Sequence, residues 1–190
     1  MRRLQDLNEI EQMERNRLEV AAASVKDSIR SVLQRVEEQI AETLNAIRKQ
    51  IDDDPDLRGR RDLLTSIDGI GERTAALLLA ELGDPLHFES ARAITAFAGL
   101  NPKLQDAGTH KGQVRISRTG SARLRAGLYI PAVVSMTYNI AINALAKRLR
   151  ARGKAGKQIV CAAMRKLLHI VYGVLKSAQP FDPQLALAQG

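Results

Sequence analysis

The chain has 190 residues, a single cysteine, no tryptophan and only 3% aromatic residues. This length suits one domain of ordinary size with an extension. The single cysteine, Cys161, excludes an internal disulfide framework and a cysteine-rich zinc site. A core made of Leu, Ile, Val and Ala with few aromatic residues favours helices over sheets, so we expect an all-α fold.

Hydropathy points away from a membrane. No apolar run reaches about 18 residues, so nothing is expected to span a bilayer. The N-terminus MRRLQDLNEIEQ carries charge but lacks the apolar segment of a secretory signal. We therefore expect a cytoplasmic protein.

The two parts of the chain differ in charge. Residues 1–57 hold 9 Lys/Arg and 13 Asp/Glu, a net charge of −4, whereas residues 58–190 hold 20 and 8, a net charge of +12. From Ala107 to the end there are 14 basic residues and one acid, Asp182. Because solvated surfaces normally mix both signs, this imbalance indicates a polyanionic partner, with nucleic acid the leading candidate. An anionic membrane fits less well, since the apolar faces have the pattern of a core.

Residues 3–51 contain neither Gly nor Pro and carry a helical apolar stripe. Its members from Ile29 onward are spaced by three and four residues: Ile29, Leu33, Val36, Ile40, Leu44, Ile47 and Ile51. The pattern predicts a single helix about 70 Å long at 1.5 Å per residue. We interpret residues 1–54 as a coiled-coil arm that pairs chains into a homo-oligomer. The alternative is one long arm docked on the chain's own domain.

The segment DDDPDLRGR ends this arm, and a helical domain is expected over residues 55–183. The four acids resemble a metal site, but Asp before Pro commonly stops one helix and caps the next. We therefore assign no metal ligand. Residues 57–83 are expected to form two helices joined by the turn Asp68-Gly69-Ile70-Gly71.

This hairpin resembles the helix-hairpin-helix motif of DNA-binding proteins. Gly69 and Gly71 would allow positive φ and would present backbone N–H groups to a phosphate at a helix N-terminus. A purely structural αα-hairpin would also favour glycine here.

A basic loop follows a helix expected at residues 90–98. Residues 101–125 hold three Gly and six Lys/Arg against one acid. Long loops of this kind in compact domains are usually functional or disordered. We expect the loop and the start of the next helix to neutralise phosphates through Lys111, Arg115, Arg118, Arg123 and Arg125. The alternative is a solvated, disordered loop with ordinary surface charges.

Three further helices are expected at residues 121–138, 140–150 and 157–177, with a kink at Pro131. The segment AKRLRARGKAGK between the last two has six basic residues and no acid, which makes Arg152 and Lys154 candidates for nucleic-acid contacts. His169 lies in an apolar stretch and is interpreted as a core residue. Residues 184–190 are expected to be a frayed tail.

Five stretches in one order are more particular than these patterns: SIDGIGERTAALLLAELGD, FAGLNP, RISRTGSARLRAGLYIPA, MRKLLHIVYGVLKS and PFDP. Together they resemble the C-terminal transposase domain of the insertion-sequence one-ten family, the serine transposases guided by a bridge RNA. The resemblance covers about residues 60–183. In that family a coiled coil joins the subunits and links this domain to an N-terminal RuvC-like nuclease domain.

The resemblance implies a composite active site for DNA transposition, in which residues 101–120 are the active-site loop. The RuvC-like half holds Mg²⁺ through acidic residues, and the C-terminal half contributes a serine that attacks a DNA phosphodiester and becomes linked to it. This chain has no room for the RuvC-like domain, so we expect no cofactor in the chain itself.

The second departure from the family concerns the nucleophile. The family's serine stands in a Ser-Gly pair shortly after GLNP, where this sequence has Asp106-Ala107-Gly108. Ala107 therefore occupies the nucleophile position, and we expect the isolated chain to be inactive. Thr109 and Ser117 are weaker substitutes, because attack geometry tolerates little displacement.

Two functions of different kinds follow. The first is the DNA-binding catalytic half of a transposase that acts with a guide RNA, in the cytoplasm and associated with the nucleoid. The second is a non-catalytic helix-hairpin-helix module that binds duplex DNA. Alanine at position 107 argues against the catalytic function, and a RuvC-like domain encoded upstream would argue for it.

Overall fold

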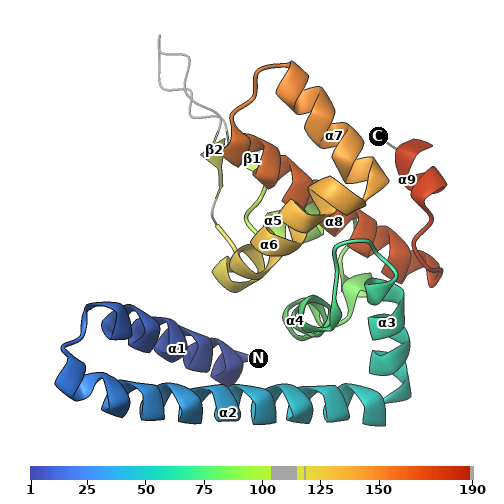
Figure 1. The fold of residues 1–190 in the computed structure, drawn as a ribbon. Helices are drawn as coiled ribbons and strands as arrows, with labels where there is room; N and C mark the ends of the chain where they lie inside the picture. The colour runs from blue at the N-terminus through green and yellow to red at the C-terminus, as the bar shows by residue number, and fades with distance from the viewer. Residues whose placement is uncertain (104–114, 118, 189–190) are drawn as a thin grey trace. The chain divides into compact units, whose positions relative to one another are not determined.

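The computed structural model describes residues 1–103, 115–117 and 119–188 (Figure 1). The chain separates into two compact units, unit 1 (Met1–Pro55) and unit 2 (Asp56–Gly190). The described residues are helical except for turns and one pair of two-residue strands. The predicted all-α fold is therefore confirmed.

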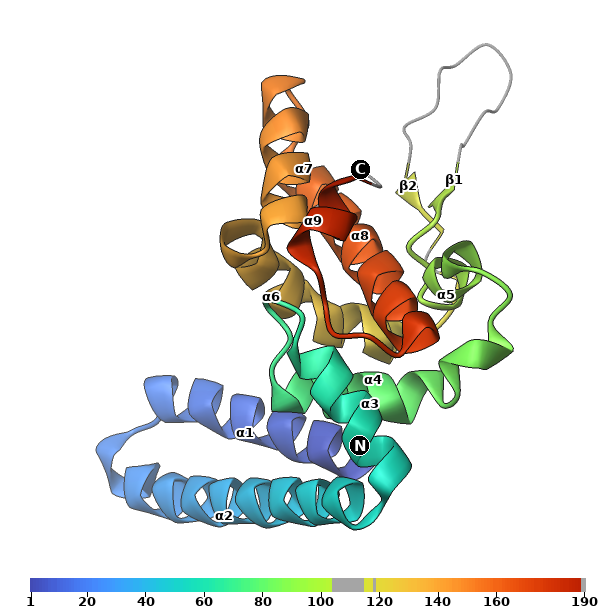
Figure 2. The same cartoon turned by 90° about the vertical axis from the view of Figure 1, so that its right-hand side faces the viewer.

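Unit 1 is an antiparallel pair of helices, α1 (Arg2–Val20) and α2 (Ala23–Asp53), which lie side by side in Figure 2. The prediction of one continuous helix is wrong, because Ala21 and Ala22 have extended backbones with ψ of 144° and 150°. Folding back brings the apolar stripes of the two helices together and buries Leu4, Leu7 and Leu33.

The energetic reason for the break is this burial. Each apolar side chain removed from water contributes about 1.5–3 kcal/mol, and each backbone hydrogen bond lost at a break in a helix costs about 0.5–1.5 kcal/mol. Burial of Leu4, Leu7 and Leu33 together therefore offsets the few hydrogen bonds lost. A further cross-helix contact is the ion pair of Arg15 Nη2 with Glu37 Oε1, at 2.6 Å. Val25 and Val32 on α2 remain exposed.

The predicted helical hairpin is present in unit 2. Helices α3 (Pro55–Thr65) and α4 (Glu72–Leu82) are joined by a turn, and the 3-10 helix η1 (Pro85–His87) and α5 (Ala91–Phe97) follow. Ser90 starts α5 by accepting a hydrogen bond from the Ala93 N–H on its side chain.

After α5, the two-residue strands β1 (Pro102–Lys103) and β2 (Arg115–Ile116) pair antiparallel. Three long helices complete the unit: α6 (Ala122–Tyr138), α7 (Ile140–Ala151) and α8 (Gly156–Ser177). Helix α6 continues through the buried Pro131, and it meets α7 at an angle of 90°. Asn139 occupies this corner, and its Oδ1 caps α7 by accepting the Ile142 N–H at 3.2 Å.

Residues 183–188 form the short helix α9 (Pro183–Ala188). The prediction of a frayed tail is therefore wrong for residues 184–188. Asp182 Oδ1 accepts the Gln184 N–H at 2.8 Å, and Pro183 takes the first helical position, where its missing N–H costs nothing. Just before it, the Phe181 N–H bonds Ser66 Oγ at 2.8 Å and ties this segment to the hairpin.

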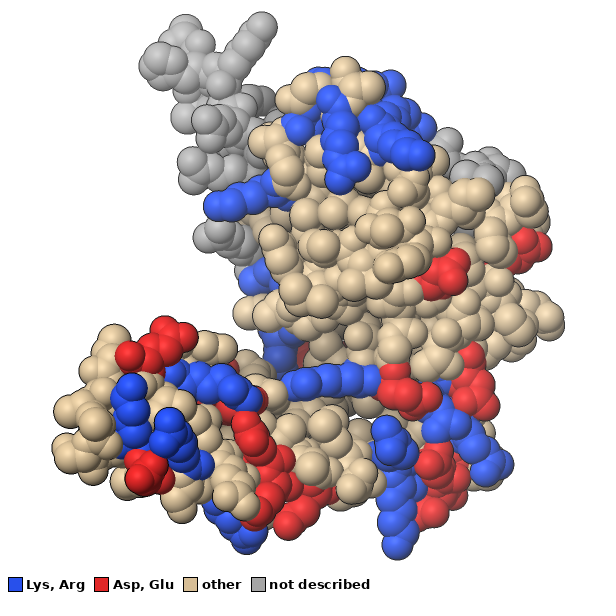
Figure 3. All heavy atoms as spheres, in the orientation of Figure 1, with Lys and Arg blue, Asp and Glu red and all other residues tan. Residues whose placement is uncertain are grey.

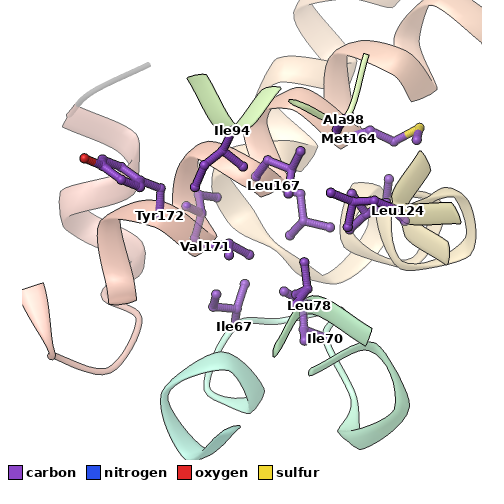
Figure 4. Packing of buried hydrophobic residues seen from close by; sticks show 14 of the residues in the cluster. Ile67, Ile70, Leu78, Ile94, Ala98, Leu124, Met164, Leu167, Val171 and Tyr172 are labelled. Carbon is purple, nitrogen blue, oxygen red and sulfur yellow. The ribbon is translucent and has the colours of Figure 1, made fainter. Parts of the chain in front are cut away.

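Helix α8 is the centre of the core of unit 2 (Figure 4). Its Met164, Leu167 and Val171 lie among apolar side chains from every other long element of the unit. These partners include Ile67, Ile70 and Leu78 of the hairpin, Ile94 of α5 and Leu124 of α6. Helices α5, α6 and α7 thus pack directly on α8, while α4 packs on α6 and α9 on α7.

By length and composition alone, α8 could cross a membrane, and so could α6 and α7 if they were taken together despite their bend. In the described structure 56% of the apolar window of α8 is buried within the protein. The same composition is expected of a central core helix, so this signal is weak evidence for a membrane span.

Candidate nucleic-acid interface

The turn between α3 and α4 is shaped by its contact with α6. Gly69 has a φ of 99°, and a Cβ added there would lie 2.0 Å from Ser135 Oγ. Ser135 Oγ donates to the Asp68 carbonyl at 3.0 Å, and the Ile70 N–H bonds the Ile67 carbonyl at 2.9 Å. Gly69 is therefore required because α6 approaches the turn closely.

Gly71 has a different role from the one expected. Its φ is −94°, so the prediction of a positive φ holds for Gly69 and is wrong for Gly71. Gly71 is exposed and is the N-cap of α4, where the first N–H groups of a helix lack intrahelical acceptors. Glu72 stands in that first turn, and its carboxylate complements the helix dipole at the place where a phosphate was expected.

The basic loop leaves and rejoins the domain at adjacent points. Pro102 pairs with Ile116 and Lys103 with Arg115, and the Ser117 N–H bonds the Asn101 carbonyl at 2.9 Å. The buried Thr95 of α5 donates from Oγ1 to Asn101 Oδ1 at 2.7 Å. Both ends of the loop are thus fixed to the end of α5.

The returning limb is held by a second set of contacts, which we call the loop clamp: Glu81, Gly120, Ser121, Arg123 and Arg125. Glu81 Oε2 accepts from Ser121 Oγ at 2.9 Å, and Glu81 Oε1 pairs with Arg123 Nη1 at 3.0 Å. Ser121 Oγ also accepts the Leu124 N–H at 3.0 Å and so caps α6. One half-buried carboxylate of α4 therefore fixes the start of α6.

Gly120 and Arg125 complete the loop clamp. Gly120 has a φ of 134°, and a Cβ there would lie 2.2 Å from the Phe97 carbonyl oxygen, which accepts the Ser121 N–H at 2.8 Å. Arg125 Nη1 donates to the Ala98 carbonyl at 2.9 Å. Arg123 and Arg125, which the sequence suggested as phosphate ligands, each use one guanidinium nitrogen to position the loop.

Several predicted site residues lie outside the described residues: Ala107, Thr109, Lys111 and Arg118. Arg115 belongs to β2, and only its backbone is described. Ser117 is half-buried beside the loop, where its Oγ accepts the Thr119 N–H at 3.2 Å. In the described contacts, Ser117 has no carboxylate or imidazole that could serve as a general base.

Arg152 and Lys154 lie at the end of α7, far along the chain from the loop. Arg152 is the C-cap of the helix, and Gly153 follows with a φ of 68°. The Lys154 N–H closes the turn by bonding the Leu149 carbonyl at 3.1 Å. Both side chains are exposed, and Figure 3 shows Lys and Arg gathered where α7 ends.

No group of three or more His, Cys, Asp or Glu side chains that could hold a metal ion is present among the described residues. The acids near the hairpin are instead used in ion pairs, such as that of Arg60 Nη2 with Asp56 Oδ2 at 3.1 Å.

Four residues that hold the ends of the loop were not predicted from the sequence: Glu81, Thr95, Asn101 and Ser121. Ser121 was detectable, because a serine just before a helix commonly caps it. Glu81 gave no local signal, since its two partners lie 40 and 42 residues further along the chain.

Comparison with known proteins finds a family similarity over part of the chain. Residues 61–147 match the Transposase IS116/IS110/IS902 family. This segment contains the end of α3, the turn after it, α4, both ends of the loop, the loop clamp, α6 and most of α7. The segment is thus similar to proteins of the transposase class.

Individual relatives agree with that class. The chain is 37% identical over 175 residues to a pilin gene-inverting protein from Moraxella bovis and, equally, to one from Moraxella lacunata. It is 29% identical over 123 residues to an insertion element IS110 protein of 43.6 kDa from Streptomyces coelicolor. The alignments cover 90% of this chain with either Moraxella protein and 65% with the Streptomyces one. The chain spans 54% of each Moraxella relative and 30% of the Streptomyces protein.

Proposed function

We propose that this chain is the DNA-handling half of a transposase or DNA-inverting recombinase. The observation that carries the proposal is the position of the loop clamp. The segment similar to the transposase family contains the clamp and both anchored ends of the basic loop. A loop whose two ends are fixed can present its cations to a phosphate backbone in a defined position.

In this proposal unit 2 binds duplex DNA with the loop, with Arg152 and Lys154, and with the exposed turn at Gly71. Arg123 and Arg125 have guanidinium nitrogens beyond those used in the loop clamp, because each carries five N–H donors. They can therefore position the loop and contact phosphates at the same time.

The catalytic step that we propose for the complete recombinase is attack by a serine hydroxyl on a DNA phosphodiester. The protein then carries a phosphoserine ester to one end of the cut strand. The other end of the same strand leaves with a free hydroxyl group, which takes up a proton in place of the one lost by the serine. This ester keeps the bond energy needed for rejoining. In this chain position 107 is alanine, so we expect no covalent linkage from the chain alone.

The further components follow from the same proposal. Mg²⁺ is assigned to carboxylates of a RuvC-like domain of the complete recombinase, and a bridge RNA is assigned as the guide. The second candidate function, a non-catalytic DNA-binding module, is favoured by one observation, the alanine at position 107.

Self-association through unit 1 is also part of the proposal. Much of the predicted coiled-coil stripe now lies between α1 and α2, but Val25 and Val32 are 48% and 45% exposed and lie seven residues apart. This spacing places them on one face of α2, where we propose a contact with a second chain. Val25→Ser with Val32→Ser should lower the mass measured by light scattering; an unchanged oligomeric state would refute this contact.

The proposed DNA binding is tested by measuring the affinity of the full chain for a DNA duplex across a salt series. Arg118→Ala should weaken binding to all sequences alike and reduce the salt slope by about 0.9. Arg125→Ala should do the same, with its fold checked by urea denaturation because of its contact with Ala98. Arg2→Ala, which removes an exposed arginine from unit 1, is the matched control. Absence of duplex binding at low salt would refute the proposed function.

A further inference from the structure

A second group of basic residues gathers on α8 and on the helices beside it. It consists of Arg165, Lys166 and His169 of α8, Arg92 of α5 and Arg148 of α7. Helices α5 and α7 both pack against α8. We call these five residues the α8 basic face; none of them belongs to the loop clamp or to the sites that the sequence suggested.

The α8 basic face has no nearby acids on its own elements. Helices α5, α7 and α8 contain no Asp or Glu, and none occurs anywhere in residues 107–181. In the part of the chain that the structure describes, Arg92, Arg148 and Arg165 take part in no ion pair. Grouped like charges repel each other, so an anion from outside the chain would relieve this repulsion.

Two polar atoms of this face are buried without a partner. Within the described residues neither Arg165 Nε nor His169 Nε2 makes a hydrogen bond, although both atoms are inaccessible to solvent. The two residues are four positions apart on α8 and therefore lie on the same side of the helix. Buried polar atoms are normally hydrogen-bonded, so two neighbouring exceptions mark an unusually polar place on a helix that otherwise belongs to the core.

Electrostatics supports the same grouping. Burial lowers the pKa of His169, and Arg165, Lys166 and Arg92 lower it further. Burial also lowers the pKa of Lys166, with a contribution from Arg148. His169 thus lies near Arg92, Arg165 and Lys166, and Lys166 in turn lies near Arg148.

We propose that the α8 basic face binds the phosphate backbone of a nucleic-acid strand, as a contact separate from the basic loop. The class of ligand rests on the proposed function, whereas the position rests on the five residues. Phosphate oxygens would accept hydrogen bonds from the exposed guanidinium groups of Arg92 and Arg148. The half-buried Arg165, Lys166 and His169 would add positive charge beneath them. Contacts of this kind position a strand without reading its bases.

The three histidines of the chain allow a direct test in the unmodified protein. His169 belongs to the α8 basic face, His87 is exposed on η1, and His110 lies in the sequence of the basic loop. Imidazole NMR spectra are recorded with a 20-nucleotide DNA strand, its duplex and an RNA strand of equal length. We expect the His169 signals to move and its pKa to rise with at least one of these, because a bound phosphate favours the charged imidazole. His87 should stay unchanged.

The outcomes of this test separate the two proposals. Movement of His110 with His169 unchanged would overturn the α8 contact and leave the proposed function intact. Absence of binding to all three nucleic acids would overturn both. The nucleic acid that moves His169 at the lowest concentration identifies the strand that this face holds.

Charge-removing variants give a second readout. Arg92→Gln with Arg165→Gln should reduce the salt slope by about 1.8 and the affinity by roughly tenfold per contact at 0.1 M salt. Arg2→Gln with Arg3→Gln removes the same charge from exposed positions in unit 1 and should change neither. Arg148→Gln alters an exposed side chain and is used if the double variant does not fold; it should reduce the slope by about 0.9. Equal effects in test and control variants, or none in either, would overturn the assignment.

Discussion

Replacing Gly69 with alanine should strongly destabilise unit 2. A φ of 99° costs an alanine about 1–3 kcal/mol. The added Cβ would also lie 2.0 Å from Ser135 Oγ and 3.1 Å from Ser135 Cα, so the turn or α6 must move. Overpacking of this kind typically costs about 1–3 kcal/mol. Together we expect a loss of about 2–6 kcal/mol in the free energy of unfolding.

The assay is urea denaturation followed by far-UV circular dichroism, with the midpoint and slope compared between variants. Gly59→Ala is the matched control, because Gly59 lies inside α3 and an added Cβ there meets no atom within 4 Å. That change should stabilise the protein by about 0.5–1 kcal/mol. If Gly69→Ala had the midpoint and slope of the parent chain, the close approach of α6 to the turn would be refuted.

Three further predictions follow from the described contacts. Glu81→Gln should cost about 1–2 kcal/mol of unfolding free energy, because the charge-assisted bond to Arg123 is lost; the exposed Glu89→Gln should change little, and equal effects would count against the loop clamp. Gly120→Ala should destabilise the fold and weaken DNA binding, since its Cβ would meet the Phe97 carbonyl oxygen; a variant that binds DNA with parental affinity would contradict this. The pKa of His169 is lowered in the folded chain, so below about pH 6.5 the unfolded chain binds more protons and the free energy of unfolding falls as pH falls. The variant His169→Gln should therefore lose less stability than the parent between pH 7.5 and 5.5. An identical loss in both would refute the lowered pKa of His169.

Local sequence signals predicted most helices of unit 2 within a residue or two. Gly83 at the end of α4, Ser90 before α5 and Asn139 before α7 are residue types that end or cap helices. The break at Ala21-Ala22 had no such signal, since alanine is the best helix former. Only the packing of α1 on α2 accounts for the break, and this packing cannot be predicted from the sequence of either helix alone.

The candidate site likewise has features that the sequence predicted and features that gave no local signal. The glycines placed the turn between α3 and α4 correctly along the chain, whereas residues 104–114 of the expected basic loop lie outside the described residues. The carboxylate of Glu81 and the carbonyl groups of Phe97 and Ala98 hold the loop through partners distant in sequence, and such partners give no local pattern. His169 seemed an ordinary core residue because its neighbours Leu168 and Ile170 are apolar, but the basic residues near it come from α5 and from the adjacent turn of α8.

The central claim is that this chain is the DNA-handling half of a recombinase with its nucleophile position at residue 107. The most direct test compares Ala107→Ser with the parent chain. Each is combined with the part of the Moraxella bovis relative outside the match, Mg²⁺, labelled duplex DNA and RNA that copurifies with the assembled protein. Covalent protein–DNA adducts are then separated on a denaturing gel. We predict an adduct with Ala107→Ser and none with the parent; equal adducts in both would move the nucleophile to Thr109 or Ser117, and no adduct in either would contradict the claim.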